Sequence, residues 1–260
     1  GQQAVPNNED DIDIGAIDMV KSPLMMSQRS SGTESSARAP AIGHETYRDS
    51  RRRLWWFTIG AVAASIVLTL LVQLHLLLGL DLTVTLALQH FANLPLDRLS
   101  ELLSLVFSSE GTALMALIIS FTLWRDGFGR WSLLPFAFAF PVAIELVLRL
   151  FIHQPLIPPQ LYREGSYPLL NPDLPSSFPS GHAIRSSFVC TLGIALLAGR
   201  RDAASRTPCW LLATLFVVAA LSRVYLGTHW LSDVVDGALL GTIAGLWTAQ
   251  EIVHRYRSPS

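Results

Sequence analysis

Charged residues are scarce in this sequence. Asp, Glu, Lys and Arg together make up 15% of its 260 residues, while hydrophobic residues make up 50%. A soluble domain of this length needs charge spread over its surface, whereas here the charges gather in short clusters between long apolar runs. The composition therefore excludes an ordinary soluble globular domain and indicates an integral membrane protein.

Lysine and cysteine are nearly absent. Lys21 is the only lysine among 19 basic residues, so almost every cation is an arginine, whose planar guanidinium suits bidentate contact with phosphate or carboxylate. The formal net charge of −1 gives no support for a nucleic-acid partner. Cys190 and Cys209 fall in or beside apolar runs, and we interpret them as small buried hydrophobes. Because no Cys/His cluster has zinc spacing, we expect no metal and no cofactor.

Residues 1–50 contain no sustained apolar run. They are polar and rich in Ser, Asn, Asp and Glu, which predicts a disordered tail. The tail also has no apolar stretch long enough for a secretory signal. Residues 51–257 are then expected to form a single transmembrane domain.

Six apolar runs in residues 51–257 predict membrane-crossing helices. An α-helix rises about 1.5 Å per residue, so roughly 20 residues cross a hydrocarbon core about 30 Å thick. Residues 81–104 are mixed in character and favour an amphipathic helix and turn at the outer face. We therefore predict an all-α, six-helix bundle with spans at about 54–80, 105–124, 131–151, 182–199, 208–225 and 232–253.

The uneven distribution of arginine predicts the orientation of this bundle. Only Arg98 and Arg163 occupy clear loop positions on one side. The opposite side carries Arg51, Arg52, Arg53, Arg125, Arg130, Arg200, Arg201, Arg206, Arg255 and Arg257. Because cytoplasmic loops are enriched in Lys and Arg, we expect both termini in the cytoplasm and the proline-rich loop at 153–180 outside.

Three distant segments are predicted to bring ionisable residues to the outer membrane edge. These are the end of the third span (145–155), the start of the fourth (177–182), and the stretch Ser222–Asp233 between the fifth and sixth. Such convergence at one depth is typical of a functional site.

Two of these segments carry motifs that resemble the type 2 phosphatidic acid phosphatase family, which also includes the vanadium haloperoxidases. Pro-Ser-Gly-His at residues 179–182 matches the second motif of that family. Ser222-Arg223, five residues, His229, three residues and Asp233 match the third. The resemblance covers about residues 100–253. It implies a metal-independent phosphatase that acts through a phosphohistidine intermediate.

The chemistry of phosphoryl transfer assigns a role to each residue of the third motif. The reaction needs a nucleophile and cations for the phosphoryl oxygens. His229 is the candidate nucleophile. Asp233 lies four residues on, and if the helix already runs there, one face carries both residues and the carboxylate can hold the other ring N–H of the imidazole. Arg223 supplies a bidentate clamp.

The second motif supplies the remaining parts. Ser180 and Gly181 lie where the fourth span begins, so a hydroxyl and backbone amides would face the anion at a helix N-terminus. His182 is then the general acid for the departing group. We interpret His44, His75, His90 and His254 as interfacial residues.

The first motif departs from the family pattern. Arg149 stands where the family usually has Lys, and Leu156 stands where it has Arg. We expect a second layer in which Arg185, paired with Glu145 or Asp236, supports the phosphate layer without touching substrate. Two alternatives stay open. Arg185 could bind phosphate directly, or Arg163 or His153 could fold in from the outer loop.

The predicted function is hydrolysis of a lipid phosphate or diphosphate at the outer face of the cell membrane. A site at the membrane edge can take a headgroup while the acyl or prenyl chain stays in lipid. Undecaprenyl diphosphate, phosphatidic acid and phosphatidylglycerol phosphate are all candidate substrates. A phosphotransferase of the same family, a non-catalytic lipid-phosphate-binding protein, and a transporter or channel are the alternatives.

Overall fold

The computed structural model describes residues 39–163, 176–198 and 205–257, and every regular element in these ranges is a helix. The prediction of an all-α fold is confirmed for this part of the chain. The α-helices are α1 (Ala39–Gln73), α2 (Leu78–Gln89), α3 (Leu94–Val106), α4 (Ser109–Arg125), α5 (Ala139–Phe151), α6 (Gly181–Ala198), α7 (Arg206–Tyr225) and α8 (Leu231–Arg257). Two 3₁₀ helices are η2 (Gly129–Phe138) and η3 (Pro159–Leu161).

Several helices are long and apolar enough to cross a membrane. Four segments meet this description by length and composition, namely Tyr47–Gln73, Gly129–Phe151, Gly181–Ala198 and Arg206–Tyr225. Helices α3 and α4 together would make a fifth span, bent by 54°. These helices support an integral, multi-pass membrane protein. α8 is not among the candidate spans, and its first turns carry Asp233 and Asp236.

The first helix differs from its predicted bounds at both ends. α1 begins at Ala39, inside the predicted tail, while residues 1–38 lie outside the described residues. It ends at Gln73, because residues 74–77 form a turn in which His75 has a φ of 57°. The turn contains no Gly or Pro, so this largely apolar stretch offered no turn signal of that kind.

The region predicted as one outer-face helix and turn, residues 81–104, forms parts of two helices. α2 and α3 meet at Asn93, whose side chain caps α3 by accepting a hydrogen bond from the Leu96 amide at 3.0 Å. The predicted third span is also composite. Its first half is the 3₁₀ helix η2, which contains Pro135, a residue with no amide hydrogen to donate to an α-helix.

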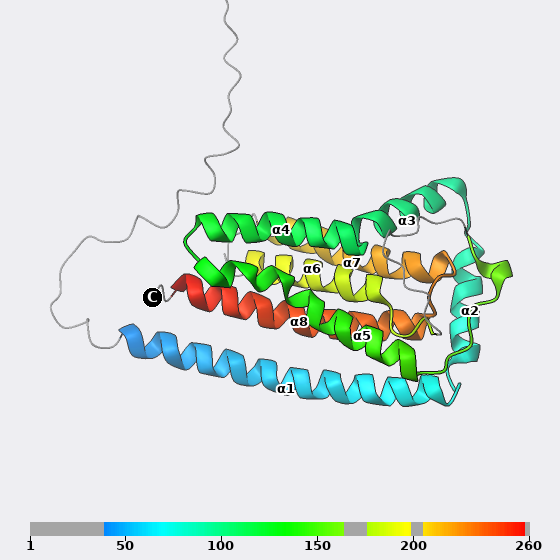
Figure 1. The fold of residues 1–260 in the computed structure, drawn as a ribbon, viewed down its shortest axis with the longest axis horizontal. Coiled ribbons are helices and arrows are strands. Elements are labelled where there is room, and N and C mark those ends of the chain that lie inside the picture. Colours follow the sequence, from blue (N-terminus) through cyan, green and yellow to red (C-terminus); the bar gives the residue numbers. More distant parts are fainter. Residues whose placement is uncertain (1–38, 164–175, 199–204, 258–260) are drawn as a thin grey trace, which may run out of the picture. The chain divides into compact units, whose positions relative to one another are not determined.

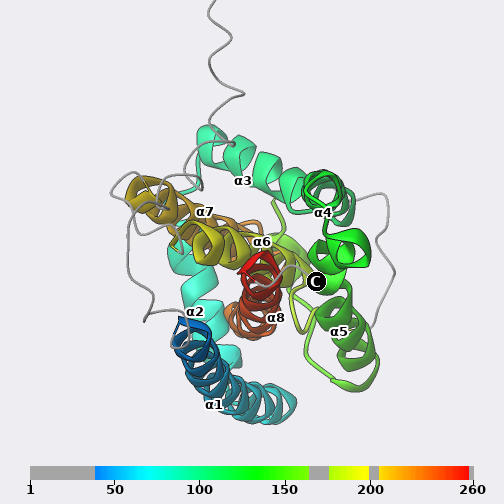
Figure 2. The same cartoon turned by 90° about the vertical axis from the view of Figure 1, so that its left-hand side faces the viewer.

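Helices α6 and α8 pack side by side at the centre, and the other helices surround them (Figures 1 and 2). Three glycines spaced by four residues, Gly237, Gly241 and Gly245, line the face of α8 toward α6. A Cβ at Gly241 would overlap the Ser187 hydroxyl and the Ile184 carbonyl oxygen. Only glycine therefore permits this close approach of the two helices.

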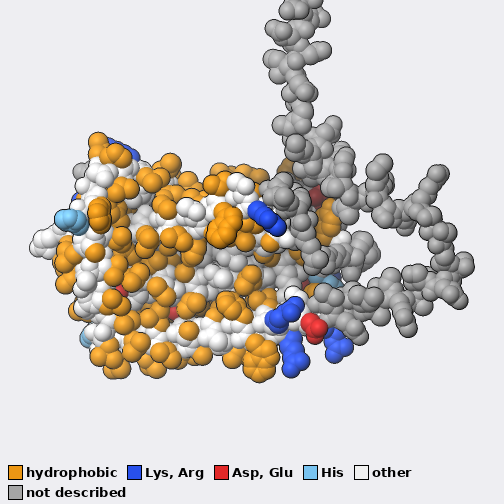
Figure 3. Space-filling model, turned by 180° about the vertical axis from the view of Figure 1, so that it is seen from behind, with side chains coloured by type: hydrophobic (Ala, Val, Ile, Leu, Met, Phe, Trp, Pro, Cys, Tyr) orange, Lys and Arg blue, Asp and Glu red, His pale blue; other side chains and the backbone are white. Residues whose placement is uncertain are grey.

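Apolar side chains cover most of the face shown in Figure 3, and most of the visible cationic side chains gather toward one end of it. The core between the helices is also apolar. It includes Cys190, which is buried and free, while Cys209 is partly buried and free. Cys190 is thus the small buried hydrophobe that was predicted, whereas Cys209 is only partly buried.

Candidate active site

A tight turn after α7 places His229 beside α8. The Thr228 and His229 amides both donate to the Arg223 carbonyl oxygen, at 3.2 and 3.3 Å. Gly227 has a φ of +67°, and the space where its Cβ would lie is filled by the Leu161 carbonyl group. Glycine is therefore required here both by the backbone conformation and by the close contact.

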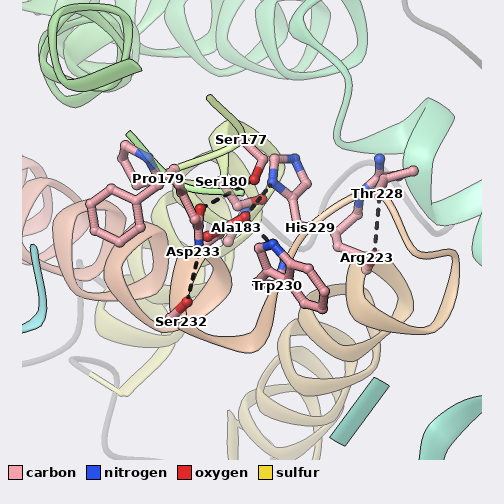
Figure 4. A network of polar contacts seen from close by, with 12 residues as sticks. Ser177, Pro179, Ser180, Ala183, Arg223, Thr228, His229, Trp230, Ser232 and Asp233 are labelled. Carbon is pink, nitrogen blue, oxygen red and sulfur yellow. Dashed lines mark hydrogen bonds and ion pairs between the residues drawn. The ribbon is translucent and has the colours of Figure 1, made fainter. Parts of the chain in front are cut away.

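The structure brings His229 and Asp233 together (Figure 4). His229 Nδ1 lies 3.4 Å from Asp233 Oδ2, and the same carboxylate oxygen accepts the Trp230 amide at 3.0 Å. One oxygen of Asp233 thus caps the first turn of α8 and also orients the imidazole. With the Nδ1 proton directed at the carboxylate, Nε2 keeps a lone pair for attack.

The His229 side chain is buried, at 6% exposure. Burial lowers the pKa of His229 to about 4, although the hydrogen bond to Asp233 acts in the opposite direction. The imidazole is therefore neutral near physiological pH, which is the state that a nucleophile requires.

This shift predicts the acidic limb of the pH profile. Activity that depends on neutral His229 is expected to persist down to about pH 5 and to fall below about pH 4, because the lowered pKa keeps the His229 imidazole unprotonated until the pH approaches 4. The measurement is kcat/KM for a soluble phosphomonoester, corrected for the ionisation of the substrate. Size-exclusion chromatography at each pH serves as the folding control. A limb centred near 6.5, the ordinary pKa of histidine, would contradict the assignment.

The second motif begins α6 next to this pair. The Ser180 amide donates to the Asp233 carbonyl oxygen at 3.0 Å, and the Ser180 hydroxyl accepts the Ala183 amide at 3.4 Å. The Gly181 amide donates to the Glu145 carboxylate, which lies where a Gly181 side chain would be. Because Glu145 occupies this position, the contact between the Gly181 amide and phosphate stays a prediction.

Two buried arginines, Arg185 and Arg223, and the partly buried Arg149 converge on the two histidines. Arg149 Nη2 lies 2.9 Å from Glu145 Oε1 and 3.3 Å from the Pro179 carbonyl oxygen. Arg223 Nη1 donates to the Ser104 hydroxyl. Arg185 lies close enough to both for their charges to interact.

Arg185 contacts the candidate acid directly. Its Nη2 lies 3.4 Å from His182 Nδ1, and its Nε donates to the Phe107 carbonyl oxygen at 2.9 Å. The carboxylates whose charges act on Arg185 are Glu145 and Glu110. Of the two acids expected to pair with Arg185, Glu145 is therefore close to it. Glu110 is a second counter-charge that the sequence did not indicate.

The other predicted candidates lie elsewhere. Asp236 is fully buried near Ser65 of α1. Arg163 is paired with Asp97, and the His153 amide donates to Gln73 Oε1 at 2.9 Å. Leu156, at the position that departs from the first motif, has 63% of its surface exposed.

The chain is similar to known proteins over the region that holds this cluster. The PAP2 superfamily matches residues 130–257, a range that contains all three converging segments. A curated protein of Escherichia coli, named "Putative undecaprenyl-diphosphatase YbjG", is 30% identical over 153 residues, which cover 56% of this chain and 71% of that protein. The chain belongs to the PAP2 superfamily.

The PAP2 fold is confirmed by a solved structure. The crystal structure of "the first transmembrane PAP2 type phosphatidylglycerolphosphate phosphatase from Bacillus subtilis" aligns with a TM-score of 0.64 at 17% identity. The alignment covers 78% of this chain and 98% of that one. Since both PAP2 relatives bear the names of phosphatases, this chain is a membrane phosphatase of the same superfamily.

Two acidic residues outside the PAP2 motifs hold the start of α8 and the end of α7. Asp81 accepts both the amide and the hydroxyl of Ser232, at 2.9 and 2.7 Å, at the start of α8. Asp97 accepts two hydrogen bonds from Arg163, at 2.7 and 2.8 Å, and one from the Tyr225 hydroxyl at 2.6 Å. The bond to Asp97 raises the pKa of Arg163. These contacts join residues far apart in sequence, so no local pattern indicated them.

Asp97→Asn is expected to lower the stability of the fold by about 1–3 kcal/mol, because it weakens the bidentate pair with Arg163 and the bond to Tyr225. Thermal unfolding in detergent measures the effect as a fall in Tm of several degrees. The matched control is Arg98→Ala, whose pair with Glu101 is 68% exposed on the arginine side and is expected to contribute little. Equal shifts for the two variants would contradict this role of Asp97.

Proposed function

We propose that the protein hydrolyses a lipid phosphate or diphosphate through a phosphohistidine formed on His229. The observation that carries the proposal is the buried imidazole of His229, which contacts Asp233 and lies near the guanidinium groups of Arg149 and Arg223. A nucleophile, an orienting carboxylate and cations at one point are what phosphoryl transfer requires.

In the proposed reaction, His229 Nε2 attacks phosphorus while Arg223 and Arg149 stabilise the phosphoryl oxygens. In this proposal, the ring N–H of His182 serves the departing oxygen. Water then cleaves the N–P bond and releases inorganic phosphate. Within the described residues, no group of three or more His, Cys, Asp or Glu side chains could hold a metal ion. Metal independence is part of the proposal and is tested with EDTA.

We infer that six helices cross the membrane, with both termini in the cytoplasm and the site at the outer face. The excess of arginine on one side supports this orientation. A site at the membrane edge admits a headgroup from the bilayer. The names of the two relatives add undecaprenyl diphosphate and phosphatidylglycerolphosphate to phosphatidic acid as substrates to test. Activity of intact right-side-out vesicles on a membrane-impermeant phosphate ester would support the outer face.

The experiment that tests the function is phosphate release by the purified protein in detergent. Undecaprenyl diphosphate, phosphatidic acid and phosphatidylglycerol phosphate are each supplied with and without EDTA. Release that persists in EDTA supports the proposal. If none of these lipids yields phosphate although each is bound, the protein is a non-catalytic lipid-phosphate-binding protein instead. Transfer of the phosphoryl group to an added alcohol rather than to water would indicate a phosphotransferase.

A further inference from the structure

We propose that Arg185 makes this site selective for a phosphoanhydride over a phosphomonoester, and hence for a lipid diphosphate over a lipid monophosphate. The inference rests on the proposed function. It concerns the leaving-group side of the site, where His182 faces the departing oxygen. Arg185 acts there through His182 as a positioning residue.

The Arg185 guanidinium is held in one place. Its side chain is buried, at 6% exposure, and Nε is bonded to the carbonyl oxygen of Phe107, itself 2% exposed. Nη2 lies 3.4 Å from His182 Nδ1. A guanidinium has only N–H donors, so Nδ1 must be the acceptor in this contact. The proton of the neutral His182 ring is therefore on Nε2.

The groups around His182 fit this assignment. The guanidinium groups of Arg223 and Arg185 both lie near enough to act on the ring electrostatically, and His182 Nε2 makes no hydrogen bond within the described residues. If Nδ1 also carried a proton, two N–H groups, one from His182 and one from Arg185, would face each other and repel. In this arrangement His182 offers one N–H hydrogen bond, at Nε2, backed by a fixed positive charge.

A donor of this kind suits a phosphate leaving group. An alcohol leaves as a strongly basic alkoxide unless it receives a proton, and a neutral imidazole is a poor source of one. A phosphate monoester has a second pKa of about 6, so it departs as a stable dianion that needs hydrogen bonds and nearby positive charge. Arg185 and the Nε2–H of His182 supply both.

The reaction balances without proton transfer to the leaving group. His229 Nε2 forms a bond to the terminal phosphorus, the bond from that phosphorus to the bridging oxygen breaks, and its electron pair stays on the lipid monophosphate. The products of this step are N-phosphohistidine and the lipid monophosphate dianion. Water then attacks phosphorus, the N–P bond breaks, and H₂PO₄⁻ and neutral His229 are formed.

The test compares initial rates on two substrates that share one chain, farnesyl diphosphate and farnesyl monophosphate. The purified wild-type protein is expected to prefer the diphosphate by about 100-fold or more in kcat/KM. Arg185→Met is expected to lower diphosphate cleavage by about 100-fold and monophosphate cleavage by less than about 10-fold, so the selectivity falls at least tenfold. Arg185→Lys keeps the charge and should recover part of the selectivity. Arg149→Met, at the attacked phosphoryl group, should lower both rates alike.

The ratio of two rates on one preparation does not depend on how much of a variant is folded. Wild-type protein that cleaves both substrates equally well overturns this inference alone. An equal loss of both activities in Arg185→Met also overturns it, because Arg185 would then bind the attacked phosphoryl group or only support the fold. No cleavage of either farnesyl substrate, or of the lipids named above, would overturn the proposed function itself.

A spectroscopic measurement tests the hydrogen-bond assignment independently of activity. In protein labelled with ¹⁵N-histidine, the His182 signals are identified by their loss in His182→Gln. The inference requires an unprotonated Nδ1 and a protonated Nε2 in the wild type, and a change in this pattern in Arg185→Met. A protonated Nδ1 in the wild-type protein would overturn it.

Discussion

His229→Ala is expected to lower phosphate release by about 10⁴-fold or more, because it removes the atom that forms the bond to phosphorus. The remaining arginines still bind the anion, so substrate affinity should change far less than kcat. Phosphate release in detergent measures the loss. Brief incubation with substrate labelled at the transferred phosphate, followed by alkaline denaturation, should trap labelled protein in the wild type and none in the variant.

The matched control for His229→Ala is His90→Ala, which removes an exposed histidine at the end of α2. This control should retain wild-type rates and wild-type labelling. If His229→Ala kept a tenth of the activity, water rather than His229 would be the nucleophile. Activity of the wild type that is lost in EDTA and restored by a divalent cation would point to the same conclusion.

Gly241→Ala is expected to destabilise the protein by about 3–5 kcal/mol, because its Cβ would overlap Ile184 and Ser187 at the closest contact of α6 and α8. In a chain of this size, each kcal/mol shifts Tm by about 2–4 °C, so the fall should be on the order of 10 °C. Thermal unfolding in detergent, with the size-exclusion profile of the purified variant, measures the effect.

Gly60→Ala provides the control for Gly241→Ala. It is also a glycine within an α-helix, but a Cβ there meets nothing within 4 Å. Alanine favours the helix by up to about 1 kcal/mol over glycine, so Gly60→Ala should leave Tm unchanged or raise it. If both variants unfolded at the same temperature, the close approach of α6 and α8 would not be a source of stability.

The sequence predicted the parts of the site that depend on local geometry. His229 and Asp233 are four residues apart, which suggested a shared helical face, but α8 begins at Leu231 and the two side chains meet across its first turn instead. Ser180 and Gly181 lie at the start of α6, as the sequence predicted, and the Ser180 hydroxyl accepts the Ala183 amide there as an N-cap does. The all-α fold followed from the length of the apolar runs.

The parts that depend on tertiary contacts could not be predicted in the same way. The anchor of Arg185 is a backbone carbonyl of Phe107, 78 residues earlier, and a carbonyl group has no sequence signature. The pairing of Asp97 with Arg163 joins residues 66 positions apart. The turn after α1 falls in a largely apolar stretch without Gly or Pro, and it lets α2 pack against α7 and α8, which are distant in sequence.

The hydrogen bond from the Ser180 amide to the Asp233 carbonyl oxygen has a consequence for how this site can change over evolution. Because both partners are main-chain atoms, no ordinary side-chain replacement removes the bond, and the spacing between the segments that carry His182 and His229 is inherited with the fold. New substrates must then be accommodated by the opposite wall, which α3 and α5 provide.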